Sequence, residues 1–471
     1  MSDSVFPEKN YQGEMDGSEA VVSAVAAEPT SGVNIAPSEP IPQVKRRWLS
    51  NIILTFSLFA DNNESGIVST LFALIRAEFG LSLSALGILT AMGKIIAAIF
   101  GPLWSILARR YNRKLVLVVA TVVFGLWTIA IGFAQNYTQF LILFAIATIG
   151  TVSATPIMTE IIGDLFRDNE RGRAIGFVYG ALALAGSLTT PLLGQLANVP
   201  HGWRVAYYII GGIMAISGLV ILVGVYDPGR GATEAGRART ANQSAQISSL
   251  KWSEVKQLFT IPSYILMLVS RILSGHLLLQ SFGIVYMVTV LHFSTAQAAV
   301  AYGGSYFGYT VGTFVGGFVV DQLNKWSPSY GRVLSLQLAQ ALFAVVALFM
   351  LIFSGNNMGL VIAFFFVLFF LQGVNPGINR PIVYSVTPPA LRGAAFAVMV
   401  SIVESIGWAI YNLLAGFLGD IFGLQAIFFV VLVVLMVANA AVIFLLYRTY
   451  WPDVQRLQAQ LAEQQMSAEG A

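Results

Sequence analysis

Long apolar runs recur along this chain, and short polar breaks separate each run from the next. A helical run of about 20 residues crosses the ~30 Å hydrocarbon core of a bilayer, because an α-helix rises about 1.5 Å per residue. Lipid offers no hydrogen-bond partners for backbone N–H and C=O groups, so single runs can cross it only as helices. The sequence therefore predicts an all-α polytopic membrane protein.

The composition supports the same class of protein. Charged residues make up 10% of the 471 residues, and hydrophobic residues make up 56%. A soluble domain carries roughly 25% charged residues, so a soluble fold would have too little polar surface here. About twelve runs are long enough to be membrane spans. We expect these spans at residues 48–75, 83–107, 115–134, 140–162, 173–196, 205–226, 262–291, 298–320, 333–354, 360–386, 393–418 and 424–447.

A polar loop divides the chain near its middle, and the two halves resemble each other. The second span of each half ends in a short loop with Asn and Lys, and an Arg-Gly pair follows the fourth span of each half, at Arg171 and Arg392. Weak internal symmetry of this kind is typical of duplicated transporter bundles. The expected segments are a disordered cytoplasmic tail at 1–47, an N-terminal six-helix bundle at 48–226, a cytoplasmic linker at 227–257, a C-terminal six-helix bundle at 258–448 and a cytoplasmic tail at 449–471.

Basic residues gather in alternate breaks, while the breaks near Gln135, His201 and Asn356 are nearly free of them. Loops rich in Lys and Arg usually lie on the cytoplasmic side of a membrane. We therefore expect an integral protein of the plasma (inner) membrane with both termini in the cytoplasm. The same rule predicts that one membrane face holds Arg109, Arg113, Arg171, Arg239, Asp321 and Arg392.

Several motifs support a family resemblance. Two bundles of six spans, a basic loop after spans two and eight, and a Gly-x-x-x-Asp sequence from Gly317 to Asp321 resemble the major facilitator superfamily over nearly the whole chain outside the tails. Within that superfamily, Asp61 in the first span and the runs 111–114 and 161–166 resemble the Spinster-like branch. The narrower resemblance implies a lysolipid or sphingolipid as the transported molecule.

The chain also departs from these family patterns. Arg109 stands where the first basic loop usually has Asp, so Asp321 alone keeps the acidic contact between the bundles that the resemblance implies. Arg109, Arg113 and Asp321 are therefore the expected loop and gating residues. Spinster-like proteins tend to have Arg after the first-span Asp and in span four, where this chain has Asn62 and Glu160. Their coupling chemistry cannot be transferred directly.

Charged side chains at membrane depth are functional candidates, because each costs about 2.5 to 3.5 kcal/mol on insertion scales. In the first half these are Asp61, Glu64, Lys94 and Glu160. Asp61 and Glu64 are three residues apart and share a helix face. Two crowded carboxylates beside an ammonium group can exchange protons. We expect proton coupling by the two acids, modulated by Lys94 or Glu160; alternatively, Lys94 only neutralises one acid as a structural pair.

Polar residues on spans seven, ten and eleven form the expected substrate site. His276 and Gln280 are four residues apart, as are Asn375 and Asn379. Each pair therefore forms a polar stripe on its helix. Arg271 and Arg380 offer the fixed charge that suits a carboxylate or phosphate, and we expect Arg271 to point into a central cavity. The alternative is that Glu404 neutralises Arg380 and that His276 is a satisfied interior side chain. The expected substrate-binding residues are Arg271, His276, Gln280, Asn375, Asn379, Arg380 and Glu404.

Prolines on span ten suggest a break in that helix. Pro376 and Pro381 should interrupt it, and a discontinuous helix can line a cavity with free backbone groups. A simple packing kink is the alternative.

The chain has no cysteine, which excludes disulfides, iron–sulfur clusters and thiolate zinc sites. Its three scattered histidines do not provide a metal site. We expect no enzyme activity, no catalytic residue, no metal and no cofactor. The expected partners are a small organic substrate, protons and membrane lipid, without nucleic acid, and the chain should act as a monomer.

These features predict a secondary active transporter that rocks two bundles about a site at the membrane midplane and couples to protons. Its substrate should be a small organic solute that is either amphiphilic and lipid-like or anionic. Lipid or drug export predicts a mostly apolar cavity that opens sideways to lipid, whereas organic-anion uptake predicts an enclosed cavity with converging arginines. A membrane-embedded enzyme and a transporter-derived sensor are the alternatives outside transport.

Overall fold

The computed structural model describes residues 44–230, 232 and 252–469. Every regular element in these residues is helical. Ten helical segments are long and apolar enough to cross a membrane, and α1 (Arg47–Phe79) and α12 (Thr295–Trp326) are 33 and 32 residues long and pack beside them. The prediction of an all-α membrane protein with about twelve spans is confirmed.

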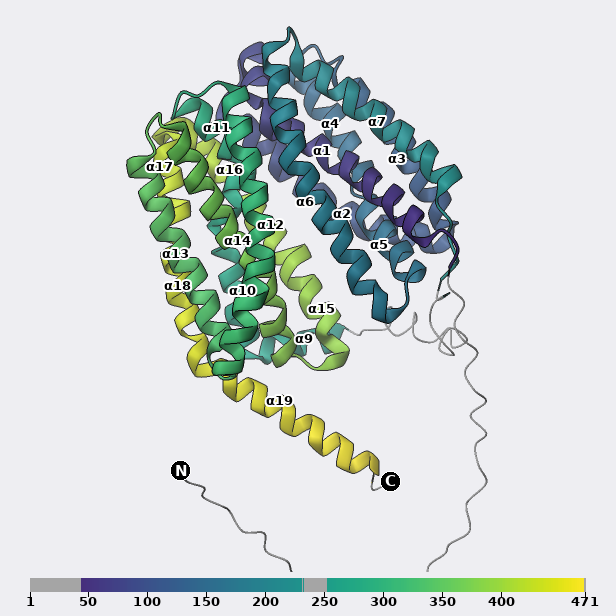
Figure 1. The fold of residues 1–471 in the computed structure, drawn as a ribbon, viewed down its shortest axis with the longest axis vertical. Coiled ribbons are helices and arrows are strands. Elements are labelled where there is room, and N and C mark those ends of the chain that lie inside the picture. The colour runs from purple at the N-terminus through teal and green to yellow at the C-terminus, as the bar shows by residue number, and fades with distance from the viewer. Residues whose placement is uncertain (1–43, 231, 233–251, 470–471) are drawn as a thin grey trace, which may run out of the picture. The chain divides into compact units, whose positions relative to one another are not determined.

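The helices form two bundles that follow each other along the chain (Figure 1). The first bundle contains α1, α2 (Leu83–Arg110), α3 (Arg113–Ile131), α4 (Tyr137–Thr151), α5 (Ala154–Leu165), α6 (Asp168–Gln195), η1 (Leu196–Asn198) and α7 (Gly202–Gly224). Between the bundles lie α9 (Trp252–Gln257) and η2 (Leu258–Thr260). The second bundle contains α10 (Pro262–Ile272), η3 (Gly275–Leu277), α11 (Leu278–Thr289), α12, α13 (Gly331–Phe353), α14 (Met358–Val386), η4 (Pro389–Leu391), α15 (Arg392–Ala397), η5 (Val398–Glu404), α16 (Ser405–Phe422), α17 (Leu424–Phe428), η6 (Phe429–Val434) and α18 (Leu435–Phe444).

The segments outside the bundles are only partly described. The expected disordered tail lies almost entirely outside the described residues, as does most of the expected linker. At the other end of the chain, a single helix, α19 (Leu446–Glu469), follows α18 directly.

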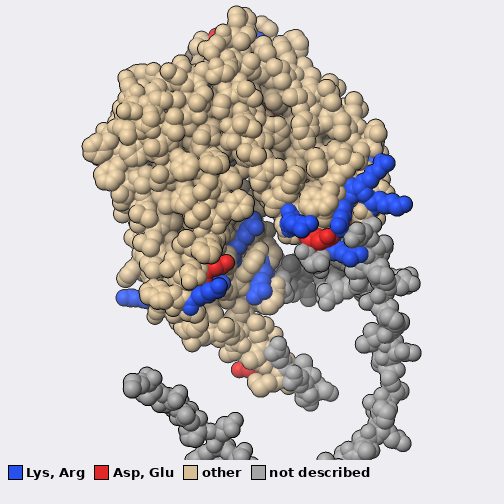
Figure 2. Space-filling model, viewed as in Figure 1, with Lys and Arg blue, Asp and Glu red and all other residues tan. Residues whose placement is uncertain are grey.

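Successive spans alternate in direction, so the charged loops gather at one end of the bundles, which we call the basic end. This end contains Arg109, Arg113, Arg171, Asp321 and Arg392, each at or near a helix terminus; Arg239 lies outside the described residues. Figure 2 shows Lys and Arg side chains gathered at this end, where the surface is notched between the bundles, and mostly uncharged residues elsewhere on the visible face.

The apolar cores show where the two bundles are joined. One large cluster of buried residues combines side chains from both bundles, among them Leu71 and Leu86 of the first and Leu278 and Tyr411 of the second, and it occupies the non-basic half. In the basic half each bundle has a core of its own. The two bundles are therefore sealed together at the non-basic end and separate toward the basic end.

Close helix contacts reinforce this seal. Gly87 on α2 packs against α16, where a Cβ atom would come within 2.4 Å of the Asn412 carbonyl oxygen. The carboxylate of Asp420 on α16 accepts hydrogen bonds from the N–H groups of Leu83 and Ser84 at 2.7 and 3.0 Å. The first N–H groups of a helix have no partner within the helix, so a side chain of the second bundle caps α2 of the first.

Candidate functional site

A cavity of about 280 Å³ lies in the second bundle, toward the middle of its helices. Its walls come from α10 to α11, α12, α14 and the segment from α15 to α16. Most of its lining residues carry a polar group. The structure brings all seven expected substrate-binding residues to this one cavity, which are Arg271, His276, Gln280, Asn375, Asn379, Arg380 and Glu404.

Breaks in two of the lining helices shape this cavity. The helix expected to be continuous over 262–291 is interrupted at Ser274, whose φ and ψ of −75° and 69° are not helical. Gly275 follows it, and a Cβ there would lie 2.1 Å from the Val431 carbonyl oxygen, so only glycine fits. In the facing wall, η5 is a π-helical turn that ends at Glu404. Such turns are frequent at functional sites.

The expected break in span ten is absent. Pro376 and Pro381 lie inside α14, which continues from Met358 to Val386. The discontinuous helix of the cavity is span seven instead, whose break lies next to the close approach of Gly275 to η6, whereas α14 accommodates its prolines.

Arg271 and Glu404 form an ion pair at the side of the cavity. Nε and Nη2 of Arg271 donate to the same carboxylate oxygen, Oε2, at 3.1 and 2.5 Å. The two side chains are only 13% and 15% exposed. The sequence-based alternative paired Glu404 with Arg380, but the structure pairs it with Arg271, so the charge of Arg271 is largely balanced.

Arg380 has a different environment. Its guanidinium carbon lies 4.7 Å from the centroid of the Phe396 ring, and no carboxylate of the described residues forms an ion pair with it. An arginine held against an aromatic face keeps its planar donor edge available for an anion. Arg380 is therefore the uncompensated cation of the cavity lining.

Neutral polar groups line the deeper part of the cavity. His276 and Gln372 are 2% and 4% exposed, and Nδ1 of His276 and Oε1 of Gln372 have no hydrogen-bond partner among the described residues. Gln340, on α13 behind the lining, donates to Oδ1 of Asn375 at 2.6 Å and fixes that amide. The sequence analysis missed both glutamines, although their place in apolar spans was a signal that could have identified them.

Lys94 lies between the bundles rather than beside the acids of span one. Its Nζ is 3.5 Å from the centroid of the Trp408 ring on α16, and its charge interacts with that of Glu404. Within the described residues Lys94 forms no ion pair with Asp61 or Glu64. The alternative in which Lys94 neutralises one of those acids is therefore not what the structure shows.

Asp61 and Glu64 are buried in the first bundle, at 6% and 1% exposure. Both carboxylate oxygens of Asp61, and Oε1 of Glu64, have no hydrogen-bond partner among the described residues. The two acids interact electrostatically with each other, and Tyr207 on α7 lies within electrostatic range of Glu64. The structure therefore holds two adjacent buried carboxyl groups that have no counter-ion among the described residues.

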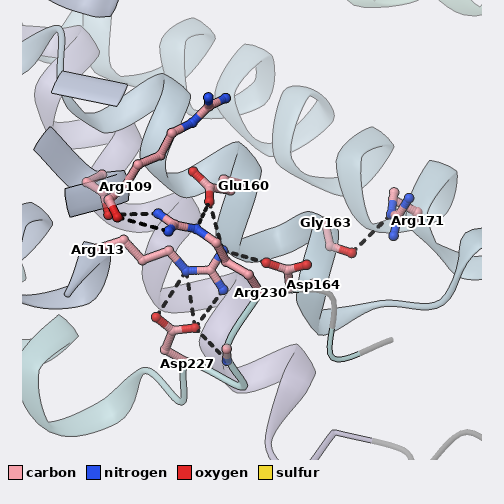
Figure 3. A network of polar contacts seen from close by, with 10 residues as sticks. Arg109, Arg113, Glu160, Gly163, Asp164, Arg171, Asp227 and Arg230 are labelled. Atoms are coloured by element: carbon pink, nitrogen blue, oxygen red, sulfur yellow. Dashed lines mark hydrogen bonds and ion pairs between the residues drawn. The ribbon is translucent and has the colours of Figure 1, made fainter. Parts of the chain in front are cut away.

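Glu160 belongs to an ion-pair network at the basic end (Figure 3). The buried guanidinium of Arg113 contacts Asp227 at 2.7 Å, Asp164 at 2.5 Å and Glu160 at 3.3 Å. Glu160 also accepts a hydrogen bond of 2.6 Å from Arg230. This network ties α3 and α5 to the segment that leaves α7, and it places Glu160 away from Asp61 and Glu64.

The electrostatics of Asp227 follow from this network. Burial acts to raise the pKa of its carboxyl, but hydrogen bonds from Arg113 and from the N–H of Gly229 outweigh burial and hold the pKa below its ordinary value of 3.8. Asp227 is therefore a fixed negative charge at neutral pH, which suits a structural clamp.

The two remaining expected gating residues are exposed. The side chain of Arg109 points away from the acidic groups in Figure 3, and its carbonyl oxygen accepts a hydrogen bond from Arg230 at 3.2 Å. Asp321 forms no ion pair within the described part of the chain. Among those residues no group of three or more His, Cys, Asp or Glu side chains could hold a metal ion.

Two bundles of membrane-spanning helices, with a polar cavity in the second, are compatible with a transporter, and comparison with known families decides which kind. The Major Facilitator Superfamily family model matches residues 53–402 and 281–467. The chain belongs to the Major Facilitator Superfamily.

Individual members of the superfamily resemble the chain over different lengths. The cis,cis-muconate transport protein of Acinetobacter baylyi is 25% identical over 388 residues, which cover 79% of this chain and 88% of that protein. Protein spinster homolog 1 of Xenopus laevis is 26% identical over 225 residues, 47% of this chain and 42% of that protein. A solved bacterial homolog of the human lysosomal transporter Spinster, inward-facing and unoccupied, matches with a TM-score of 0.75 at 18% identity, over 88% of this chain and 99% of that chain.

These findings confirm the predicted superfamily, and the Spinster matches agree with the narrower resemblance. Membership makes this protein an integral membrane transporter of small molecules.

Proposed function

We propose that this transporter carries a small organic anion across the plasma membrane and couples the movement to protons. The observation that carries the proposal is Arg380, a guanidinium in the lining of a 280 Å³ cavity with no carboxylate partner among the described residues. Arg380 is exposed on the part of α14 nearer the basic end, so its guanidinium is open to an incoming anion, and a planar guanidinium is well suited to bind a carboxylate.

The charge balance of the cavity supports an anion. Arg271 and Glu404 neutralise each other, which leaves Arg380 as the net charge of the lining residues. Lys94 adds a second positive charge close by, with its Nζ 3.5 Å from the centroid of the Trp408 ring. A substrate carboxylate or phosphate would therefore enter a positive potential.

The size and lining of the cavity favour a small anion over a lipid. Drug-sized ligands occupy sites of about 300 to 1,000 Å³, so this cavity, at about 280 Å³, is slightly smaller than that range. Most of its lining residues carry a polar group, whereas lipid or drug export would require an apolar cavity that opens sideways to lipid. The similarity to a cis,cis-muconate transport protein over 79% of this chain agrees with an organic acid as the substrate class; the dicarboxylate itself is the substrate named for that relative.

The proposed cycle alternates the side from which the cavity is reached. With the basic end in the cytoplasm, as the positive-inside rule implies, the bundles are separate on the cytoplasmic side and sealed on the other. Protonation of the pair Asp61 and Glu64 would remove buried negative charge from the first bundle. A change of charge that favours one of two states shifts the balance between them, which is what coupling requires.

Transport in proteoliposomes tests the proposal. Stabilisation of the purified protein by members of an organic-anion panel that includes both monocarboxylates and dicarboxylates would select the probe, since a ligand at 100 times its dissociation constant adds about 2.7 kcal/mol. The selected anion should accumulate when an inward proton gradient is imposed. A charge-assisted hydrogen bond is worth about 1.5 to 3 kcal/mol, so Arg380→Gln should weaken binding by roughly 10- to 100-fold.

A matched control distinguishes a local effect from a general loss of positive charge. Arg392→Gln makes the same change at the basic end, where Arg392 donates to the Tyr384 carbonyl oxygen and does not line the cavity. It should leave the affinity nearly unchanged. Equal losses in both variants, or transport of a lysophospholipid with no response to any organic anion, would rule out the proposal.

A further inference from the structure

We propose that the cavity selects monocarboxylates that carry a neutral hydroxyl or similar hydrogen-bonding group at their other end, and that it disfavours dicarboxylates. This inference rests on the proposed function, because it specifies which organic anion the same cavity holds. It follows from an uneven distribution of charge along the cavity.

The charged residues of the cavity lie toward the basic end. Helix α14 runs from the non-basic end to the basic end, so Arg380 is nearer the basic end than Gln372. Helix α10 runs in the opposite direction, and Arg271 precedes His276 along it. Glu404 likewise precedes Trp408 on the strongly bent span that begins at the basic end. The cavity thus has a charged mouth and a deeper floor.

The floor is polar but neutral. It contains His276, Gln280 and Gln372, with no carboxylate and no arginine among the lining residues at that depth. His276 Nδ1 and Gln372 Oε1 are buried and lack hydrogen-bond partners within the described residues. Buried polar atoms are nearly always hydrogen-bonded in proteins, so a pair of unpartnered atoms lining one cavity indicates that the ligand satisfies them.

The distance between mouth and floor suits a small molecule with two polar ends. Gln372 and Arg380 are eight residues apart on α14, which corresponds to about 12 Å along the helix axis. Part of that distance is taken up by the two side chains themselves. A six-membered ring with polar substituents at opposite positions is the probe that we match to this separation.

The neutral floor accounts for the expected discrimination. A hydroxyl group can donate to Oε1 of Gln372 and accept from an amide or imidazole N–H, so it satisfies both kinds of partner. An unsubstituted acid would leave those atoms unpaired, which sites built for hydrogen bonding penalise. A second carboxylate would be buried without a counter-ion, which costs still more.

Lys94 is the residue that could overturn this assignment. It approaches from the first bundle and lies on the Trp408 ring, but it is not one of the cavity's lining residues. If its ammonium group reached the floor, it would hold a second carboxylate. The test therefore includes a Lys94 variant.

Three acids that share one ring provide the test: cyclohexanecarboxylate, trans-4-hydroxycyclohexanecarboxylate and trans-cyclohexane-1,4-dicarboxylate. Their dissociation constants would be measured on the purified full-length protein by thermal stabilisation at neutral pH. We expect the hydroxy acid to bind about 10-fold more tightly than the unsubstituted acid, because two hydrogen bonds are gained. The dicarboxylate should bind most weakly of the three.

Variants link this preference to the floor. Gln372→Leu, and separately Gln280→Leu, should reduce the advantage of the hydroxy acid while leaving the unsubstituted acid unaffected, and the melting temperature without ligand shows whether each variant is folded. Equal binding of the hydroxy and unsubstituted acids would overturn the inference. Tightest binding of the dicarboxylate would also overturn it, and loss of that preference in Lys94→Met would identify Lys94 as the second anchor.

These results separate the inference from the proposed function. A wrong order of affinities refutes the selectivity, while weaker binding in Arg380→Gln still supports an organic anion. If none of the three acids binds, the inference fails. The proposed function fails as well only if Arg380→Gln leaves the binding of the panel anion unchanged.

Discussion

Replacing Arg271 with Gln should destabilise the protein more than it weakens anion binding. The guanidinium makes two hydrogen bonds to one oxygen of Glu404, at 3.1 and 2.5 Å, with both side chains mostly buried. Removing the cation leaves the carboxylate of Glu404 in the cavity wall without its partner. The residue that sequence reasoning assigned to the substrate is thus engaged by a neighbouring span.

The size of the effect follows from the geometry of the pair. Breaking a buried ion pair by removing one partner typically costs about 3 to 5 kcal/mol. Here the side chains of Arg271 and Glu404 are still 13% and 15% exposed to solvent, and the charge of Lys94 also acts on Glu404. We therefore expect a loss near the lower end, about 3 kcal/mol in the free energy of unfolding.

Equilibrium denaturant titration in detergent micelles would measure this loss. The double variant Arg271→Gln with Glu404→Gln should recover most of the stability, because it leaves no unpaired charge. Arg332→Gln is the matched control, since Arg332 of the same bundle donates to Ser385 at 2.8 Å and forms no ion pair in the described residues. It should cost much less.

One result would refute this reasoning. If Arg271→Gln stays within about 0.5 kcal/mol of the unmodified protein, as ordinary surface changes do, the pair with Glu404 is not important for stability. A loss of anion affinity as large as that of Arg380→Gln would then make Arg271 a direct substrate contact.

Three further predictions concern other parts of the molecule. Asp61→Asn and Glu64→Gln should each retain substrate exchange but lose accumulation driven by a pH gradient, because a neutral side chain cannot take up and release the proton; comparison of counterflow with pH-driven uptake checks this, and undiminished accumulation in both variants would place coupling elsewhere. Asp227→Asn should flatten the acid side of the stability profile: the folded pKa lies below the ordinary 3.8, so the stabilisation is complete above that value and is lost as pH falls through the lower folded value. Thermal melting between neutral pH and about pH 3 measures it, and equal acid sensitivity of the two proteins would contradict it. Asp420→Asn should weaken the cap on α2 and increase the fraction of molecules whose bundles are open at the non-basic end. Spin-label distances measured across that end report this fraction, and an unchanged distance distribution would argue against a gating role for Asp420.

Sequence alone was sufficient for the membrane class, the span count, the two halves and the shared end of the charged loops. These properties depend on the local density of apolar and charged residues, which is visible along the chain because lipid is a uniform solvent for each span. The same reasoning found the substrate candidates. A polar side chain inside an apolar span must face protein or a cavity, and Arg271, His276 and Arg380 all line the same one.

Tertiary structure decided which charges are paired. Glu404 pairs with Arg271, which lies 133 positions away along the chain, rather than with Arg380. Lys94 contacts Trp408 of the second bundle rather than the acids of the first bundle, to which it belongs. Nothing in the local sequence distinguishes these pairings, because ion pairing depends on distances between helices that are far apart in sequence. The break at Ser274 likewise lies beside a contact between distant segments, that of Gly275 with Val431, whereas the prolines that suggested a break in α14 are accommodated within a continuous helix.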